Sequence, residues 1–473
     1  MPRSKRSREI GVGQLSFTFG EPRDEAQETQ DNGSTASPQP ATARRQPERK
    51  RKWHSLIDKV YAHRNLLRAW GKVAANDGAP GIDGVSIERF RKNADQRLQQ
   101  LAEDLKTKQY RPQAVKRVFI PKSGGGERPL GIPTVRDRIV QQALLQVLEP
   151  IFEKKFSSRS HGFRPGLGCQ TATHMVDAAV NTGYAWVVDA DIQSFFDNVD
   201  HEILLTAINE EIADGSVLRL IRRILKAGVS LPNCSESEPT EIGTPQGGPV
   251  SPLLANIYLH AFDVQMKEAG HRVVRYADDF VIFARSESEA RAGLEKAREI
   301  LEGQLRLRLH PEKTRVVSED EGFEFLGFRY FRHPRTGIRL KHVREKSAKN
   351  FRAAVKRRTP RLFVQSRPDL KNMTLGHLKT NHRIRAILID VASYLDGWHG
   401  YFRTAKTFPK GDVFRRFDQY TRRRLRGVIS GKIGGSWNYK IPNALLEGLG
   451  YVSLASRQLE YKLELEAASN RKV

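Results

Sequence analysis

Residues 273–283 (VVRYADDFVIF) constrain the fold most strongly, because the adjacent carboxylates Asp278 and Asp279 interrupt two apolar runs. Runs of this length and composition predict two strands joined by a tight turn. Burying two like charges is costly without compensation, so the tip of a hairpin is the expected position for both. Carboxylate oxygens suit Mg²⁺, and a divalent cation relieves their repulsion. The alternative is an ordinary Asp-Asp turn on the surface.

A second acidic segment covers residues 186–192 (WVVDADI). Side chains alternate along a strand, so Asp189 and Asp191 share one face. If this strand lies beside the hairpin, three or four carboxylates converge. Two Mg²⁺ ions bridged by such carboxylates support nucleotidyl transfer, one ion activating a 3′-hydroxyl and the other holding a triphosphate. Asp197 and Asp200 instead indicate a solvated turn and a helix cap.

The charge balance predicts a polyanionic partner. The 473 residues contain 80 Lys and Arg against 54 Asp and Glu, a formal net charge of +26. Nucleic acid is the first candidate, and an anionic membrane surface is the alternative. No apolar run approaches the ~20 residues of a membrane span, so no membrane partner is expected. With no secretory signal and only two cysteines, Cys169 and Cys234, we expect a cytoplasmic protein associated with nucleic acid.

The chain divides by composition into three parts. Residues 1–52 form a low-complexity basic arm that is expected to be disordered. The middle, residues 53–340, alternates short apolar strands with amphipathic helices and predicts an α+β fold. Residues 341–473 lose the strand signal and are expected to be helical. One predicted helix there carries basic residues on its polar face, for which the alternative is simple solvation: Arg415, Arg416, Arg422, Arg423 and Arg426.

The residues at the hairpin match a known family. Residues 276–279 (YADD) resemble the YxDD signature of reverse transcriptases, and the Ala is typical of group II intron enzymes. Further segments resemble the other blocks of this family in the same order. They are 78–84 (GAPGIDG), 119–133 (FIPKSGGGERPLGIP), 160–165 (SHGFRP), 191–201 (DIQSFFDNVDH), 243–258 (GTPQGGPVSPLLANIY), 310–314 (HPEKT), 325–328 (FLGF) and 394–402 (YLDGWHGYF).

The resemblance implies a right-hand polymerase, with α+β fingers and palm in 53–340 and an all-α thumb or maturase region in 341–473. It implies an RNA-directed DNA polymerase that copies intron RNA from a DNA primer or target with dNTPs and two Mg²⁺ ions, assists splicing and supports retrohoming. A bacterial source is expected. Two alternatives remain: a host-adapted relative serving defence or repair, and an RNA-binding splicing cofactor whose polymerase has decayed.

The resemblance also implies roles for single residues. Asp191, Asp278 and Asp279 become the catalytic metal ligands, and Asp189 falls outside the triad. The residues expected to contact the dNTP are Lys122, Arg128, Phe196, Gln246 and Lys313. Lys122 and Arg128 would hold the triphosphate, and Phe196 would exclude a 2′-hydroxyl. The alternatives are surface charges and an ordinary core phenylalanine.

Two departures from the family pattern stand out. The family often has Lys-Gly after the Asp-Ile of the first palm block, where this chain has Gln193 and Ser194. Many intron proteins also end in an HNH endonuclease with cysteine pairs. The sequence up to Val473 has no such cysteines, so cleavage of a second DNA strand is not expected.

Overall fold

The computed structural model describes residues 52–121, 126–230, 237–238, 241–244, 247–360, 378, 380–406, 413–430 and 441–470. The chain separates into two units, residues 1–50 and 51–473, and only the second is described below. The predicted arm therefore lies outside the described residues, apart from its last residue. No described helix has both the length and the apolarity needed to cross a membrane.

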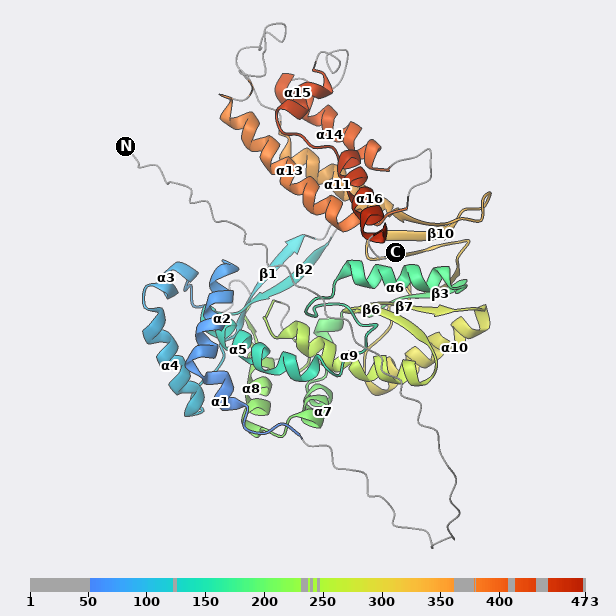
Figure 1. The fold of residues 1–473 in the computed structure, drawn as a ribbon. Coiled ribbons are helices and arrows are strands. Elements are labelled where there is room, and N and C mark those ends of the chain that lie inside the picture. Colours follow the sequence, from blue (N-terminus) through green and yellow to red (C-terminus); the bar gives the residue numbers. More distant parts are fainter. Residues whose placement is uncertain are drawn as a thin grey trace, which may run out of the picture. The chain divides into compact units, whose positions relative to one another are not determined.

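The first part of this unit is a cluster of five described helices, and a hairpin lies between the fourth and the fifth in the chain (Figure 1). Its helices are α1 (Ile57–Tyr61), α2 (His63–Ala75), α3 (Ile87–Arg91), α4 (Ala94–Lys106) and α5 (Val135–Phe152). The spacing of apolar residues over 87–106 predicts a single helix, and the structure contains two. Asn93 leaves the helical region, with φ −131° and ψ 39°, and α4 starts after it.

The apolar residues within 115–121, the glycines 124–126 and residues 130–133 predict a hairpin after α4, and the structure confirms it. Strands β1 (Val115–Pro121) and β2 (Glu127–Ile132) pair antiparallel, with Ile120 opposite Arg128. Two short strands, β4 (Val229–Ser230) and β5 (Ser237–Glu238), extend the sheet in the order β2-β1-β4-β5. The parallel pairing of β1 with β4 sets Val115 opposite Val229, so this sheet joins segments that are far apart in the chain.

A second sheet carries both acidic segments. Its strands are β3 (Trp186–Asp191), β6 (Arg272–Tyr276), β7 (Asp279–Ala284) and β8 (Arg315–Ser318), in the order β6-β7-β3-β8. The pairings β6–β7, β7–β3 and β3–β8 are all antiparallel. The hairpin predicted over 273–284 is the β6–β7 pair.

Helices cover both faces of this sheet (Figure 1). Helix α6 (Cys169–Asn181) packs on one face, and α9 (Ser251–Glu268) and α10 (Glu287–Arg298) pack on the other. The apolar side chains of β7 alternate between the two resulting cores, so the sheet is buried on both sides. The remaining elements here are η1 (Phe195–Asp197), α7 (His201–Glu211), α8 (Gly215–Leu225) and the π-helix η2 (Glu299–Gln304).

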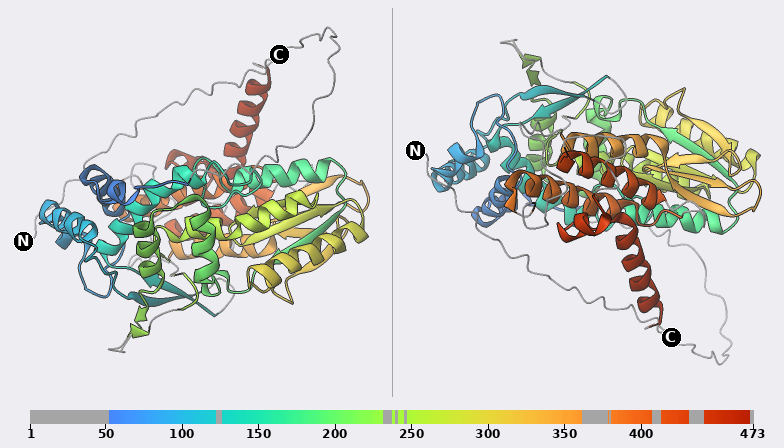
Figure 2. Two further views of the ribbon diagram at one scale, coloured as in Figure 1. Left: turned by 90° about the horizontal axis from the view of Figure 1, so that it is seen from below. Right: turned by 90° about the horizontal axis from the view of Figure 1, so that it is seen from above.

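A third sheet and a helical region complete the chain. Strands β9 (Phe323–Phe325), β10 (Phe328–Arg332) and β11 (Arg339–Val343) form the sheet, in the order β11-β10-β9. The helices are α11 (Glu345–Arg358), α13 (His382–Phe402), α14 (Val413–Ser430), α15 (Asn443–Gly448) and α16 (Leu454–Asn470). The boundary predicted at 340/341 thus falls inside β11. Figure 2 shows α16 extending outward, and its Leu459, Leu463 and Leu465 are exposed. The α+β class is confirmed.

Candidate active site

The carboxylates of the hairpin lie at its turn. Tyr276 pairs with Asp279, which leaves Ala277 and Asp278 as a two-residue connection. Ala277 has φ +58°, in the left-handed region. Two-residue hairpin loops favour positive φ at this position because it matches the twist of the strands, although glycine is the usual residue there. The hairpin thus presents Asp278 in the turn and Asp279 as the first residue of β7.

Strand β3 brings the second acidic segment beside the hairpin. In the β3–β7 register, Asp191 lies directly opposite Asp279, and Asp189 lies opposite Val281. Opposed residues of antiparallel strands place their Cβ atoms about 4.5–5.5 Å apart on the same face. The expected neighbourhood of strand and hairpin therefore exists, with Asp189, Asp191 and Asp279 on one face and Asp278 at the adjoining turn.

The surroundings of Asp279 disfavour the negative charge of its carboxylate. The pKa of Asp279 is raised to about 7, chiefly because burial disfavours its charged form. The carboxylates of Asp189, Asp191 and Asp278 raise it further, and the guanidinium of Arg344 partly opposes them. An additional cation at this point would relieve both the burial cost and the repulsion.

Two basic side chains already touch the cluster. Lys313 Nζ lies 2.6 Å from Asp191 Oδ2, and Arg315 Nη2 lies 3.4 Å from Asp189 Oδ2. The backbone N–H of His310 donates to the carbonyl of Asp191 at 2.8 Å, which ties residues 310–314 to the end of β3. Lys313, predicted as a phosphate contact, is therefore paired with a predicted metal ligand.

Asp189 and Asp191 have different surroundings in the structure, although strand alternation alone left them equivalent. Asp189 lies opposite Arg315 on β8, two residues further from the strand end than Asp191. Burial raises the pKa of Asp189, and its pairing with Arg315 opposes that shift. Within the described part of the chain, no group of three or more His, Cys, Asp or Glu side chains is already arranged to hold a metal ion.

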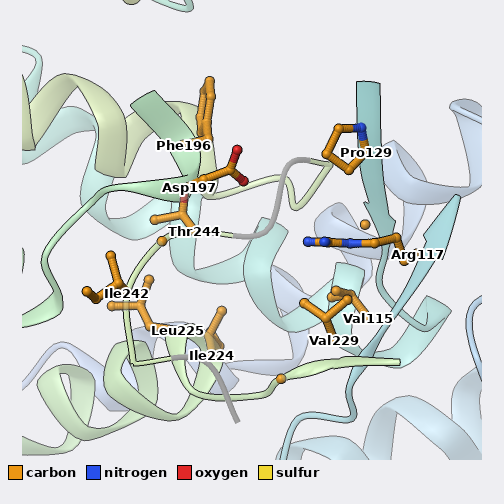
Figure 3. Close-up of a pocket in the computed structure, with 13 residues that line it drawn as sticks. Val115, Arg117, Pro129, Phe196, Asp197, Ile224, Leu225, Val229, Ile242 and Thr244 are labelled. Atoms are coloured by element: carbon orange, nitrogen blue, oxygen red, sulfur yellow. The ribbon is translucent and has the colours of Figure 1, made fainter. Parts of the chain in front are cut away.

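Phe196 lies on η1, immediately after β3, and packs against Phe195 with ring centroids 5.2 Å apart. It borders a cavity of about 280 Å³ that is also lined by Arg117, Pro129 and Thr244 (Figure 3). Figure 3 shows the Arg117 side chain extending from β1 into this space. Phe196 therefore borders a space that residues of β1 and β2 also line.

The turn before η1 contains Ser194, one of the departures from the family pattern. Ser194 has φ +47°, a conformation that glycine adopts without steric cost. The family's glycine therefore suits this backbone, and Ser194 occupies the same conformation with some strain. The departure leaves Asp191 in place.

Three of the predicted dNTP contacts are not fully described. Lys122 and Gln246 lie outside the described residues, and so does the side chain of Arg128. The backbone of Arg128 belongs to β2, opposite Ile120. Next to Gln246, a Cβ atom on Gly247 would come within 2.3 Å of the Gly131 carbonyl oxygen. Glycine is therefore required where the 243–258 segment passes β2.

The predicted basic helix is α14, and its arginines divide into two groups. Arg415, Arg416 and Arg423 are exposed, and Arg422 is half-buried. Arg426 instead donates to the Ile441 carbonyl at 2.8 Å and to Asn443 Oδ1 at 2.6 Å. Arg426 therefore has a structural partner within the protein.

Sequence reasoning missed α11, which lies closer to the carboxylates. Arg344, Ser347 and Asn350 line a cavity of about 500 Å³ together with Asp279 and Trp398. The outer face of α11 carries exposed basic residues: Lys346, Lys349, Arg352, Lys356 and Arg357. The available signal was the recurrence of Lys and Arg at helical spacing over residues 344–358.

Comparison with known proteins agrees with these features. The family model described as reverse transcriptase (RNA-dependent DNA polymerase) matches residues 120–330. Protein YkfC of Escherichia coli is 35% identical over 320 residues, covering 58% of this chain and 83% of that protein. Group II intron-encoded protein LtrA of Lactococcus lactis is 31% identical over 347 residues, covering 58% of this chain and 57% of LtrA.

One further relative matches over a shorter stretch of the chain. Nuclear intron maturase 1 of Arabidopsis thaliana is 38% identical over 94 residues, covering 20% of this chain and 13% of that protein. Among solved structures, a chain of the partial Cas6-RT-Cas1–Cas2 complex has a TM-score of 0.34 at 23% identity, covering 52% of this chain and 42% of that chain. A likeness at that level supports no argument about function.

Proposed function

This chain belongs to the group II intron family of reverse transcriptases and maturases and is an RNA-directed DNA polymerase, and we propose that Asp191, Asp278 and Asp279 form its active site. The supporting observation is the register that sets Asp191 opposite Asp279, with Asp278 in the adjoining turn. The family uses divalent metal ions and an RNA template. The choice of Mg²⁺ and the presence of two ions are part of the proposal.

The donor set fits such ions. Asp279 lies among three other carboxylates, and burial together with their charge raises its pKa to about 7. Hard oxygen ligands with excess negative charge are what Mg²⁺ requires. Asp191, Asp278 and Asp279 would hold the ions, which supply activation of the primer 3′-hydroxyl and neutralisation of the triphosphate.

The protein's own side chains would position the nucleotide. Lys313 already pairs with Asp191, and would turn to the triphosphate once metal ions neutralise that carboxylate. Lys122 and Arg128 would hold the triphosphate from the β1–β2 hairpin. Phe196 would close the space beside the sugar and favour deoxynucleotides over ribonucleotides.

Nucleic acid would reach the site along α11. The cavity beside Asp279 is lined by Arg344 and Asn350, which can bind phosphate, and by Trp398, whose ring can pack on a sugar or base. The exposed lysines of α11 and the exposed Arg415 and Arg416 of α14 would add backbone contacts. Arg426 is left out of this surface because it holds residues 441–443.

The RNA partner proposed is the intron that encodes the chain. Protein LtrA is named as a group II intron-encoded protein, and Nuclear intron maturase 1 is named as a maturase. We therefore propose that the protein assists splicing of its intron RNA and copies that RNA from a DNA primer or target in retrohoming. A bacterial cytoplasm is the proposed location, since two relatives come from Escherichia coli and Lactococcus lactis.

Primer extension tests the site. Wild-type protein is given a DNA-primed RNA template, dNTPs and Mg²⁺, beside the variants Asp191→Asn, Asp279→Asn and Asp189→Asn. We expect extension by wild type and by Asp189→Asn, and none by the other two. Equal extension by Asp279→Asn and wild type would refute the site. Loss of extension in Asp189→Asn alone would move the metal ligand from Asp191 to Asp189.

A further inference from the structure

A fully buried arginine stands directly before the carboxylate turn. Arg275, on β6, is 1% exposed. Its Nε and Nη2 atoms donate to the two carboxylate oxygens of Asp263 on α9, at 2.8 and 2.5 Å. Its Nη1 atom donates to the carbonyl of Ala277 at 2.8 Å and to Asn256 Oδ1 at 3.2 Å. One guanidinium therefore joins α9 to the turn that carries Asp278.

The energetics of this ion pair favour a positioning role over a stabilising one. Removing two charges from water costs several kcal/mol per ion, and apolar replacements of such pairs are often neutral or stabilising. The geometry uses what only arginine offers, a planar fork that binds a carboxylate bidentately while another nitrogen reaches a third group. A lysine has a single nitrogen and cannot span Asp263 and the Ala277 carbonyl in this way.

Residues 160–162 also pack against the same turn. Asn256 Nδ2 donates to the Gly162 carbonyl at 2.8 Å. A Cβ atom on Gly162 would lie 2.3 Å from the backbone nitrogen of Ala277, so the two backbones touch. Arg275 and residues 160–162 are also joined by a parallel bridge, with the His161 N–H donating to the Arg275 carbonyl at 2.9 Å. Ala277 is therefore held at its carbonyl by Arg275 and packed closely at its nitrogen against Gly162.

These contacts act on a strained residue. A left-handed conformation costs a non-glycine residue about 1–3 kcal/mol and persists only where its surroundings enforce it. Ala277 has φ +58° and directly precedes Asp278 and Asp279. Relaxation of Ala277 would turn the peptide that follows it and move both carboxylates.

We propose that Arg275 is a positioning residue, which fixes Asp278 and Asp279 for metal binding by holding the Ala277 carbonyl in the left-handed turn. This inference rests on the proposed role of those two carboxylates. Displacements of about 1 Å in a catalytic arrangement can cost about a hundredfold in rate. The expected effect of losing Arg275 is therefore on metal use and turnover, with the fold retained.

The test removes the contact between Arg275 and the Ala277 carbonyl without leaving a buried charge. In Arg275→Met/Asp263→Leu both members of the ion pair become apolar, so no unpaired ion remains. The matched control is Lys341→Met/Asp177→Leu, which removes a different buried ion pair, between a lysine on β11 and an aspartate on α6 that lie 3.0 Å apart. Arg275→Lys is the conservative variant, which keeps the charge beside Asp263.

Each protein is measured by thermal unfolding, by Mn²⁺ binding without nucleotide, and by primer extension over a range of Mg²⁺ concentrations. For the Arg275 double variant we expect an unfolding temperature near that of wild type, Mn²⁺ binding weaker by at least about threefold, and kcat lower by about 10- to 100-fold. The Lys341 double variant should match wild type in metal binding. Arg275→Lys should also bind Mn²⁺ more weakly, because it keeps the charge but loses the carbonyl contact.

Wild-type metal binding and kcat in a folded Arg275 double variant would overturn the proposal. If that variant does not fold, Arg275→Lys decides, and wild-type values there would overturn it equally. Asp279→Asn separates this inference from the proposed function. If Asp279→Asn is fully active, the proposed carboxylate site is wrong. If Asp279→Asn is inactive and the Arg275 double variant is fully active, only the positioning role of Arg275 is refuted.

Discussion

Replacing Lys313 with glutamine should strengthen metal binding while weakening catalysis. The Lys313 ammonium lies 2.6 Å from Asp191 Oδ2, with side-chain exposures of 59% and 30%. Pairs this exposed contribute about 0.2–1 kcal/mol. A metal ion that needs Asp191 must overcome that interaction, so its removal should tighten binding by about 1.4- to 5-fold. The Michaelis constant for dNTP should rise, because the same lysine is proposed to bind the triphosphate.

Mn²⁺ titration followed by electron paramagnetic resonance, in the absence of nucleotide, measures the first effect directly. Arg315→Gln is the matched control, since it frees Asp189, whose ion pair is 3.4 Å long and which lies outside the proposed metal ligands. We expect a smaller change in Mn²⁺ binding there than in Lys313→Gln. Unchanged or weaker Mn²⁺ binding in Lys313→Gln would refute the argument that this lysine competes with metal for Asp191.

Three further predictions concern neighbouring residues. Gly162→Ala should reduce kcat at least about tenfold and also lower the unfolding temperature, because its Cβ would lie 2.3 Å from the Ala277 nitrogen and one of the two backbones must shift; wild-type turnover in primer extension would contradict this. Burial lowers the pKa of His161 to about 4, so between pH 6.5 and 4 the unfolded chain binds a proton that the folded chain does not. The free energy of unfolding should therefore decrease as the pH is lowered from 6.5 to 4, and it should decrease less in His161→Gln. Urea unfolding at each pH measures this. Phe196→Ala should raise ribonucleotide incorporation relative to deoxynucleotide incorporation in primer extension, and an unchanged ratio would remove Phe196 from sugar selection.

Local patterns predicted most of the fold around the site. The apolar runs on either side of Asp278 and Asp279 predicted the hairpin, and the alternation at Asp189 and Asp191 predicted their shared face. Strand alternation predicted no difference between those two aspartates, because the difference in their surroundings depends on which residue of β8 lies opposite. Arg315 is opposite Asp189 through a pairing of strands about 125 residues apart, which no local pattern contains.

Other differences have equally physical causes. The break at Asn93 depends on a single backbone conformation within an otherwise continuous helical pattern. The helical pattern of residues 287–305 predicts one helix. Its last turns form a π-helix over Glu299–Gln304, a change in hydrogen bonding that side-chain periodicity does not reveal. The role of Arg426 in holding residues 441–443 was missed because its partners lie 15 and 17 residues further along the chain, at the start of α15.

Asp191 lies opposite Asp279 only in one register of β3 and β7, and the apolar core selects that register. Strand β7 alternates Asp279, Val281 and Phe283 on one face with Phe280, Ile282 and Ala284 on the other, and that second face is fully buried. A slip of one residue between β3 and β7 would send a carboxylate into that core, so the core rejects the wrong register. Molecules that fold at all should therefore fold with aligned carboxylates. Specific activity per mole of folded protein should then stay constant across core variants that lower stability, while the yield of folded protein varies.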